Sequence, residues 1–245
     1  MTTRRIYVAK LPQSGGFVEL TGPPARHVHV LRMRPGDSLI LFDGDGREAV
    51  GCLESIEPAK VLCRVEAAHE PTRRHTHLVL LLAIPKGSKI DDCVRMATEL
   101  GVDEIALIRT ARTVPTWPEG RVPAKLDRLE RIAQEAAAQC ERGNVPIIHP
   151  PEAYLHWVGR LPADAHGIVF GARASRRMGT LEATSRHCWC AIGPEGGFTE
   201  DEIAAFRSGG FAVASLGRLV LRVETAVPAA LSLVADRMDA FGQAR

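Results

Sequence analysis

At 245 residues, with 45% hydrophobic and 24% charged residues, the chain has the composition of a folded globular protein, which excludes the disordered and fibrous classes. Its net charge of +2 is too small to indicate a nucleic-acid partner by itself. The longest apolar run, LVLLLAIP at 78–85, is the length of a strand and not of a membrane span, and MTTRRIYVAK does not read as a signal peptide. We therefore expect a cytoplasmic protein.

The cysteine pattern gives no sign of a metal site. The six cysteines, at positions 52, 63, 93, 140, 188 and 190, include no CxxC pair and only one CxC. Zinc needs about four converging ligands, which this spacing does not supply. We therefore expect buried free thiols and no metal.

Residues 1–70 are expected to form a small all-β domain, either a barrel or a sandwich. Short β-forming runs are separated there by the turn signals SGG, GPP, RPGD and DGDG. The runs are IYV (6–8), FVEL (17–20), SLILF (38–42), REAVGCLESI (47–56) and KVLCRVEA (60–67). Basic residues gather in the same region, which indicates either a basic binding face or an ordinary solvated surface. They are Arg4, Arg5, Lys10, Arg26, His27, His29, Arg32 and Arg34.

A second domain, of the α/β class, is expected after HEPTRRHT at 69–76, a polar stretch that we interpret as a linker. HLVLLLAIP at 77–85 is typical of a strand buried on both faces, and KIDDCVRMATEL at 89–100 has a helical period that ends at Gly101. Strands and helices then alternate, which predicts a parallel sheet. We place strands at 104–108, 167–170, 188–193 and 213–216, and helices at 126–142, 199–208 and 224–241.

The loop GPEGGF at 193–198 follows one of these strands. In open parallel sheets, ligands bind beyond the carboxyl ends of the strands. The loop has no Ser, Cys, His or Lys to act as a nucleophile, whereas its glycines allow a ligand to approach the backbone closely. Thr199 and Glu202 have the spacing of a helical capping box. The loop is therefore either a backbone ligand site or a tight turn that binds nothing.

A second loop, SLGRLVLRVET at 215–225, leaves the next strand with Gly217 at its turn. Two such loops at the ends of two strands could hold one ligand between them. The glycine spacing matches neither GxGxxG nor the phosphate loop GxxxxGK[ST]. PKGSK at 85–89 also fails as a phosphate loop, and we expect its lysines to lie at a solvated helix start.

Together, the two loops resemble the RsmE family of ribosomal RNA uridine-N3 methyltransferases, in the SPOUT superfamily. IGPEGGFTEDE (192–202) and LGRLVLRVETA (216–226) carry the most specific likeness. RIYV and HVHVLRMRPGD resemble the family's N-terminal PUA-like RNA-binding barrel, and ATELGVDEI and EAAAQCERGNVP resemble parts of its catalytic domain, so the likeness covers the whole chain. One position departs from the family, because Met96 stands where a lysine is usual.

The resemblance implies a PUA-like β-barrel over residues 1–70 and a SPOUT methyltransferase domain over 76–245, whose α/β fold closes in a deep trefoil knot. It also implies S-adenosyl-L-methionine as cofactor and a homodimer with active sites at its interface. The implied substrate is N3 of a specific uridine in the 16S ribosomal RNA of the small subunit. The expected cofactor contacts are Phe170, Gly171, Ile192, Gly193, Glu195, Gly196, Leu216, Gly217 and Leu221.

The chemistry of this reaction suggests catalytic roles for three residues. Uridine N3 carries a proton, which must be removed or its anion stabilised. Arg222 is the candidate for stabilising charge on the uracil oxygens, and Glu224 or Glu195 for accepting the proton or orienting its acceptor. The alternative is that Arg222 and Glu224 form a structural ion pair.

The basic residues near the N-terminus are the candidates for holding RNA. With three tryptophans and two tyrosines in the chain, few side chains can stack on bases, so we expect phosphate and shape contacts to dominate. The candidate RNA-binding residues are Arg5, His27, Arg32 and Arg34.

Two other functions remain open from the residues. The enzyme could methylate another RNA base position or a tRNA. Alternatively, the protein could be a non-catalytic RNA-binding protein of the ribosome that uses its α/β domain for dimerisation.

Overall fold

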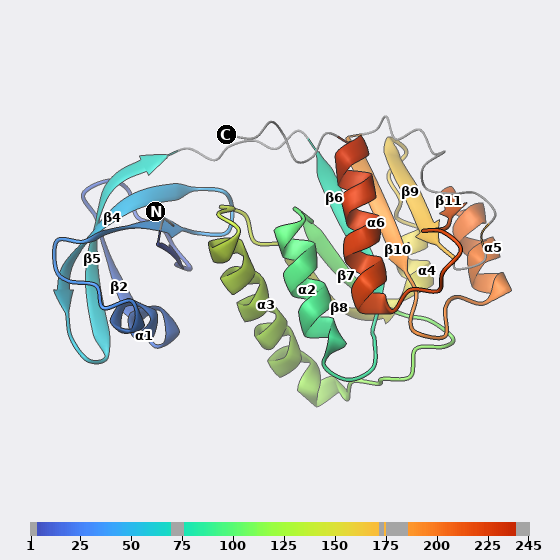
Figure 1. The fold of residues 1–245 in the computed structure, drawn as a ribbon, viewed down its shortest axis with the longest axis horizontal. Coiled ribbons are helices and arrows are strands. Elements are labelled where there is room, and N and C mark those ends of the chain that lie inside the picture. The colour runs from blue at the N-terminus through green and yellow to red at the C-terminus, as the bar shows by residue number, and fades with distance from the viewer. Residues whose placement is uncertain (1–3, 70–75, 172–173, 175–185, 239–245) are drawn as a thin grey trace. The chain divides into compact units, whose positions relative to one another are not determined.

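The computed structural model describes residues 4–69, 76–171, 174 and 186–238 (Figure 1). Contacts divide the chain into two compact units, of which the first comprises residues 1–73 and 134–145 and the second residues 74–133 and 146–245. Residues 70–75 of the predicted linker, and residues 239–241 of the predicted last helix, lie outside the described part of the chain.

The first unit is built on a five-stranded sheet in the order β1-β3-β4-β5-β2. Strand β1 runs parallel to β3, and the other neighbours are antiparallel. Alternate residues of β2, Val18 and Leu20, are buried in a core with Leu39, Leu41 and Val61. The five predicted strands are confirmed. They are β1 (Arg5–Tyr7), β2 (Phe17–Thr21), β3 (Ser38–Phe42), β4 (Glu48–Ile56) and β5 (Lys60–His69).

One helix, α1 (Pro23–Val30), corrects the expectation that this region is all-β. Two prolines occupy its first turn, where a missing N–H costs no intrahelical hydrogen bond. Ala25 and Val28, three residues apart, are its buried face. The sequence HVHV alternates like a strand, but the helix uses only its first valine for the core, since Val30 is exposed.

Residues 134–145 complete the first unit from far along the sequence. Asn144 forms isolated β-bridges with Gly44 and Asp45, and the Val145 N–H donates to the Gly44 carbonyl at 2.8 Å. The Gly46 N–H donates to the Gly143 carbonyl at 3.2 Å. The hairpin between β3 and β4 is therefore tied by backbone hydrogen bonds to a segment about a hundred residues away.

The second unit contains a six-stranded sheet in the order β11-β9-β10-β6-β7-β8, in which all neighbouring strands are parallel. The predicted α/β class with a parallel sheet is confirmed. The strands are β6 (His77–Ala83), β7 (Glu104–Arg109), β8 (Ile147–Ala153), β9 (Ala165–Phe170), β10 (His187–Ile192) and β11 (Phe211–Ala214).

Helices cover both faces of this sheet. Val79 and Leu81 of β6 pack in a cluster with Trp157 and Phe206, which belong to helices α4 and α5. On the other face α6 contacts β10, and α2 and α6 lie side by side (Figure 1). The helices of the unit are α2 (Lys89–Glu99), η1 (Glu119–Arg121), α3 (Val122–Gln139), α4 (Tyr154–Val158), α5 (Glu200–Ser208) and α6 (Val223–Arg237). Helix α3 belongs to both units, because its residues from 134 onward are part of the first unit.

The sequence analysis did not predict strand β8, and it placed strand β11 two residues too late. The run of β8, IIHPPEA, holds Pro150 and Pro151, which argue against a strand because proline cannot donate to a ladder. Strand β8 tolerates them because it lies at the edge of the sheet. Strand β11 begins at Phe211, which is buried in the same cluster as Trp157, and ends at Ala214.

Candidate active site

Three strands end level with one another at the carboxyl edge of the second sheet. Phe170 is in register with Ile192 on one side and with Ala214 on the other. The Gly171 N–H donates to the Ala214 carbonyl at 2.9 Å, which holds the first residue after β9 against the end of β11. The loops that begin with Gly171, Gly193 and Ser215 therefore leave the sheet side by side.

The loop GPEGGF is a tight turn. The Gly197 N–H donates to the Pro194 carbonyl at 2.8 Å, and Gly197 has a φ of 66°, a left-handed conformation that favours glycine. A Cβ added to Gly193 would lie 3.2 Å from the ring of Phe198 and 3.3 Å from the Gly197 backbone, so no larger residue fits there without a shift.

The predicted capping box at the start of α5 is confirmed. The Glu202 N–H donates to Thr199 Oγ1 at 3.2 Å, and the Thr199 N–H donates to Glu202 Oε2 at 2.8 Å. The second carboxylate oxygen, Oε1, accepts a hydrogen bond from the Ala111 N–H at 2.6 Å. Glu202 is therefore buried with both oxygens satisfied, and it joins the loop to the turn after β7.

Arg112 supports the same loop from the turn after β7. Its Nη1 donates to the Gly196 carbonyl at 2.7 Å and to the Phe198 carbonyl at 3.5 Å. A Cβ added to Gly196 would meet Arg112 Cδ at 3.2 Å. The space beside the Gly196 α-carbon is thus filled by Arg112, which sequence reasoning missed because the two residues are 84 positions apart.

Lys89, the first residue of α2, connects the two predicted loops. Its Nζ lies 3.3 Å from Glu195 Oε1 and 3.5 Å from Glu224 Oε2. The side chain is 33% exposed, so it lies at the helix start as expected but is not the freely solvated residue that was predicted there. Glu195 and Glu224, two of the three candidate catalytic residues, are therefore brought to one cation.

The Glu195 carboxyl is held in its ionised form. Partial burial disfavours the charge, but the amides of Glu195 and Lys86 and the Lys89 ammonium outweigh this effect and lower its pKa. The Lys86 N–H donates to Glu195 Oε1 at 3.0 Å. By contrast, Glu224 Oε2 is buried and accepts no hydrogen bond from the described residues. Glu224 is thus the carboxylate with spare acceptor capacity.

Arg222 is the N-cap residue of α6 and its side chain is exposed. Its carbonyl accepts hydrogen bonds from the N–H groups of Thr225 at 2.9 Å and Ala226 at 2.8 Å. Within the described residues, the guanidinium forms no ion pair with Glu224, whose cation is Lys89. The alternative of a structural Arg222–Glu224 pair is therefore not supported, and the guanidinium is free to meet a ligand.

The second loop exposes both its backbone and apolar side chains. Gly217 has a φ of 130°, and a Cβ there would meet nothing within 4 Å. Leu219 and Val220 are each 79% exposed, whereas Leu216 and Leu221 are half-buried. Large apolar side chains this exposed next to an open backbone mark a surface for a ligand or partner.

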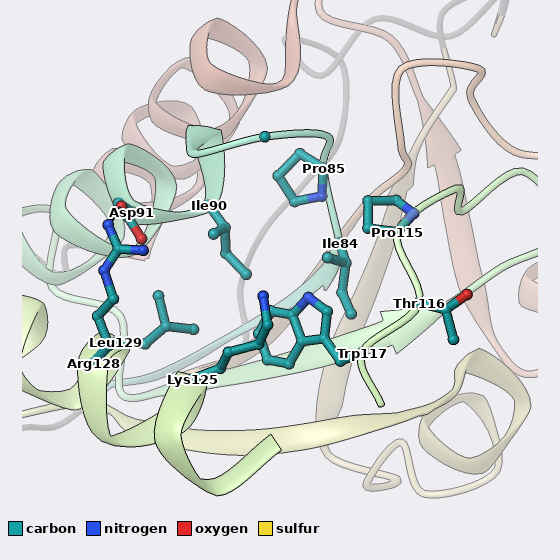
Figure 2. A pocket seen from close by; sticks show the side chains of 11 residues that line it. Ile84, Pro85, Ile90, Asp91, Pro115, Thr116, Trp117, Lys125, Arg128 and Leu129 are labelled. Carbon is teal, nitrogen blue, oxygen red and sulfur yellow. Dashed lines mark hydrogen bonds and ion pairs between the residues drawn. The ribbon is translucent and has the colours of Figure 1, made fainter. Parts of the chain in front are cut away.

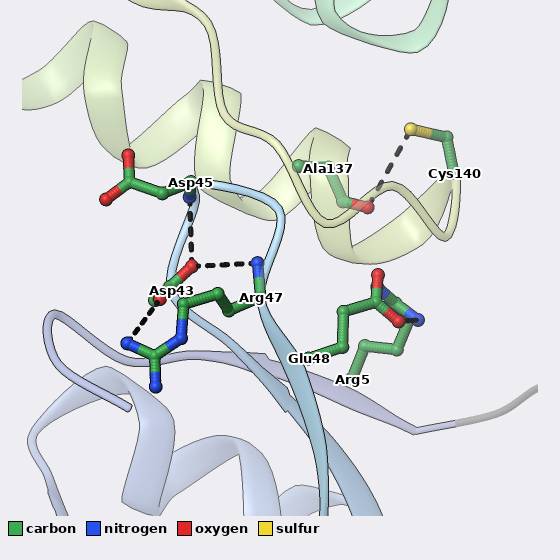
Figure 3. Close-up of polar contacts among 7 residues, drawn as sticks. All are labelled: Arg5, Asp43, Asp45, Arg47, Glu48, Ala137 and Cys140. Carbon is green, nitrogen blue, oxygen red and sulfur yellow. Dashed lines mark hydrogen bonds and ion pairs between the residues drawn. The ribbon is translucent and has the colours of Figure 1, made fainter. Parts of the chain in front are cut away.

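Arg5 differs from the other candidate RNA-binding residues. Its side chain is 6% exposed and donates to both oxygens of Glu48, at 2.5 and 3.3 Å (Figure 3). Its guanidinium carbon also lies 5.4 Å from the centroid of the Phe42 ring. Close by, the Asp43 carboxylate accepts hydrogen bonds from the Asp45 and Arg47 amides. The position of Arg5 favours a structural role within the first unit.

His27, Arg32 and Arg34 are exposed on α1 and the turn that follows it. Arg32 has a φ of 52°, unusual for a residue other than glycine, at the end of the helix. Within the described residues, the side chains of Arg32 and Arg34 form no ion pair, and only the Arg34 backbone N–H binds Asp37, at 2.8 Å. These cations are therefore available to an anionic partner.

The described part of the chain contains neither a metal-binding cluster nor a helix that could span a membrane. No group of three or more His, Cys, Asp or Glu side chains there could hold a metal ion. No helix in the same residues has both the length and the apolar character needed to cross a membrane.

Two family models match the chain. An RNA methyltransferase domain matches residues 72–235, and an RNA methyltransferase PUA domain matches residues 20–66. Among curated relatives, the ribosomal RNA small subunit methyltransferases E of Mycobacterium tuberculosis and Bacillus subtilis are each 30% identical to the chain. The first alignment covers 96% of this chain and 92% of the relative, and the second covers 90% of each.

Solved structures agree with this assignment. A putative methyltransferase of Legionella pneumophila in complex with S-adenosylmethionine superposes with a TM-score of 0.89 at 30% identity, covering 96% of this chain and 98% of that one. A ribosomal RNA small subunit methyltransferase E of Neisseria gonorrhoeae bound to S-adenosyl methionine gives a TM-score of 0.88 at 26% identity, covering 96% and 97%. With its glycine loops at one edge of a parallel sheet and relatives that cover 96% of its length, the chain belongs to the RsmE family of RNA methyltransferases.

Proposed function

We propose that this protein transfers a methyl group from S-adenosyl-L-methionine to N3 of a specific uridine in the 16S ribosomal RNA of the small subunit. The observation that carries the proposal is that Lys89 joins the two glycine loops, through Glu195 and Glu224, at the end of a parallel sheet. Relatives named ribosomal RNA small subunit methyltransferase E, and neighbours bound to S-adenosylmethionine, support it.

The carboxyl edge of the sheet fits this cofactor. Gly193 and Gly197 leave backbone where a side chain would clash or be strained, and the space beside the Gly217 α-carbon is empty to 4 Å, so amide and carbonyl groups can approach a ligand closely. When bound, S-adenosyl-L-methionine supplies an electrophilic methyl group. The residues that would hold it are Phe170, Gly171, Ile192, Gly193, Glu195, Gly196, Leu216, Gly217 and Leu221.

The three polar residues then divide the work of proton removal. Arg222, exposed and without an ion pair among the described residues, stabilises negative charge on the uracil oxygens. Glu224 accepts the N3 proton, since its Oε2, although ion-paired with Lys89 at 3.5 Å, accepts no hydrogen bond among the described residues. Glu195, ionised and anchored by Lys86 and Lys89, orients the loop and balances the charge of the lysine.

RNA binding is assigned to the first domain, over residues 1–70, and methyl transfer to the second, over residues 76–245. His27, Arg32 and Arg34 hold the RNA backbone, while Arg5 contributes by fixing β1 to β4 through Glu48. The family resemblance adds a deep trefoil knot, a homodimer and a cytoplasmic location. The exposed Leu219 and Val220 of the second loop are consistent with a surface that a partner subunit covers.

The test combines cofactor binding with mapping of the product. Calorimetry should detect binding of S-adenosyl-L-methionine by the intact protein. Small ribosomal subunits from a strain lacking the gene should then gain one methyl group at N3 of a single uridine, which reverse-transcription stops and mass spectrometry identify. A methyl group on another base would overturn the uridine assignment, and failure to bind the cofactor would leave a non-catalytic RNA-binding protein.

A further inference from the structure

A pocket of about 240 Å³ opens beside the candidate active site, within the second unit (Figure 2). It is formed by the segment after β6, the first turn of α2, the segment after β7 and the N-terminal half of α3. Ligand pockets for drug-sized molecules have about 300–1,000 Å³, so this one suits a single planar ring system better than a whole S-adenosyl-L-methionine.

Trp117 gives the pocket an aromatic wall. The side chain is half-exposed, and Lys125 Nζ lies 4.7 Å from the centroid of its ring (Figure 2). The other two tryptophans, Trp157 and Trp189, are only 5% and 8% exposed and pack against each other with centroids 5.7 Å apart. Trp117 is therefore the tryptophan of this chain that can stack on a ligand.

The opposite wall holds an ion pair whose acid is incompletely satisfied. Asp91, in the first turn of α2, is 8% exposed, and its Oδ2 accepts a hydrogen bond from Arg128. Its Oδ1 is buried and has no hydrogen-bond partner among the described residues. A buried acceptor without a donor is costly, and a ligand N–H group that reaches it would relieve the cost.

Two cations stand at the rim of the pocket. Lys125 and Arg128 are three residues apart on α3, so they lie on the same side of the helix, and both are exposed. An aromatic face, two exposed cations and a buried acceptor are the groups that meet the base ring, the phosphate and the base N–H groups of a nucleotide.

We propose that this pocket binds one nucleotide of a single RNA strand, next to the nucleotide that is methylated. The base stacks on Trp117 and donates to Asp91, while Lys125 and Arg128 meet its phosphate. Pro85 lines the pocket and Lys86, the next residue, holds Glu195 through its amide, so the pocket and the candidate catalytic loop share one segment of backbone. The identity of the strand as ribosomal RNA and the place of the pocket next to the methylated nucleotide rest on the proposed function, whereas base-dependent binding of a single strand does not.

Tryptophan fluorescence tests this directly, because a base stacked on Trp117 quenches the exposed fluorophore. A short single-stranded oligoribonucleotide should quench Trp117 emission, and the same backbone without bases should not. Trp117→Ala should weaken binding of the labelled oligonucleotide about tenfold to a hundredfold, measured by anisotropy, whereas Trp117→Phe should retain most of the affinity. Lys125→Ala, which keeps the fluorophore, should weaken binding and lower its salt dependence.

Two matched controls separate the pocket from its surroundings. Arg131→Ala removes an exposed cation from the same helix, and Val114→Ala an exposed side chain from the same loop, and neither residue lines the pocket. Both variants should bind the oligonucleotide like the parent protein.

Three results would overturn the proposal. If S-adenosyl-L-methionine alone quenches Trp117 and blocks the oligonucleotide, the pocket belongs to the cofactor. If the abasic strand quenches equally, only phosphate is bound. If a nucleoside 5′-monophosphate binds as tightly as the oligonucleotide, the pocket is a small-molecule site. Because none of these measurements needs methyl transfer, an inactive protein that still shows base-dependent quenching would refute the proposed function and leave the pocket assignment standing.

Discussion

Lys89 is the residue on which the candidate active site depends most. Its ammonium group pairs with the carboxylates of Glu195 and Glu224, which would otherwise repel each other. It thereby connects loops that follow different strands. Sequence reasoning singled out Glu195 and Glu224 as candidates and correctly placed the capping box, because each of these rests on a local pattern. It missed Lys89 and Arg112, whose partners are 106 and 84 residues away, since local spacing does not encode such contacts.

Lys89→Met should therefore weaken binding of S-adenosyl-L-methionine about tenfold, the scale of one charge-assisted hydrogen bond. Lys89→Arg keeps the charge and should restore part of the affinity. Lys86→Met is the matched control, because Lys86 contacts Glu195 through its backbone and not through its side chain. Calorimetry at neutral pH measures all four proteins, and equal affinity for Lys89→Met and the parent would contradict the linking role.

The same contact predicts a pH dependence. The Glu195 pKa is lowered, so the interaction is complete above the usual value of 4.5 and is lost as the pH falls through the lowered pKa. Without the Lys89 charge the pKa of Glu195 should rise. Cofactor affinity of Lys89→Met should then begin to fall at a higher pH than that of the parent, in titrations from pH 7 downward. Superimposable pH profiles would show that Lys89 does not hold the carboxylate.

Arg222→Ala tests the residue assigned to charge stabilisation. The single-turnover rate of methylation should fall by about a hundredfold or more, as when one donor to a developing anion is removed, with little change in cofactor affinity. Arg222→Lys should restore only part of the rate, because it lacks the planar fork of donors. Raising the pH should help Arg222→Ala more than the parent. If rate and cofactor affinity fall together, Arg222 is a cofactor residue instead.

Helices and strands were predictable where hydrophobic period and burial agree. The buried run of β6, the helical period of α2 and the capped start of α5 were found because each pattern is decided within its own segment. Helix α1 and strand β8 were not predicted because both contain prolines, which usually argue against a helix or a strand. Proline is tolerated in the first turn of α1 and in β8 at the edge of the sheet. The local sequence does not show whether a segment will lie in a first helical turn or at the edge of a sheet.

Strand β7 carries a carboxylate–histidine interaction at the amino-terminal edge of the sheet, opposite the edge that holds the candidate active site. Glu104, its first residue, accepts hydrogen bonds from His149 at 2.6 Å and His77 at 3.0 Å, which belong to β8 and β6. These hydrogen bonds, the one from His149 first, lower the pKa of Glu104 from 4.5 to about 2. One carboxylate thus connects the amino ends of three neighbouring strands.

Glu104→Gln should lower the free energy of unfolding at pH 7 by roughly 1–3 kcal/mol and leave cofactor affinity unchanged. Because the folded-state pKa is depressed, this stabilisation is complete above 4.5 and disappears as the pH falls toward about 2. Urea denaturation of both proteins across this range should show the difference shrinking. Glu99→Gln, at an exposed position on α2, is the control and should be neutral.

At the scale of the whole molecule, charge distribution matters more than the net charge of +2. Arg32→Ala combined with Arg34→Ala should weaken RNA binding and reduce the salt slope by about two, because each lost phosphate contact releases one fewer counterion. The control is Arg64→Ala, an exposed arginine of the same unit whose charge is already paired with Glu54 at 2.6 Å. An unchanged slope in filter-binding assays would mean that the two arginines only solvate the surface.

The hydrogen bonds between the β3–β4 hairpin and residues 143–145 set an order of events during protein synthesis. Most of the first unit is synthesised before residues 134–145, and the unit cannot be completed until Val145 has been added. At about 5–20 residues per second, the nascent hairpin waits roughly 4 to 15 seconds for its partner after residue 73. Throughout that interval the Gly44 carbonyl and the Gly46 N–H remain open to water or to a chaperone. The first unit therefore becomes whole only after residues 74–133 of the second unit have been made.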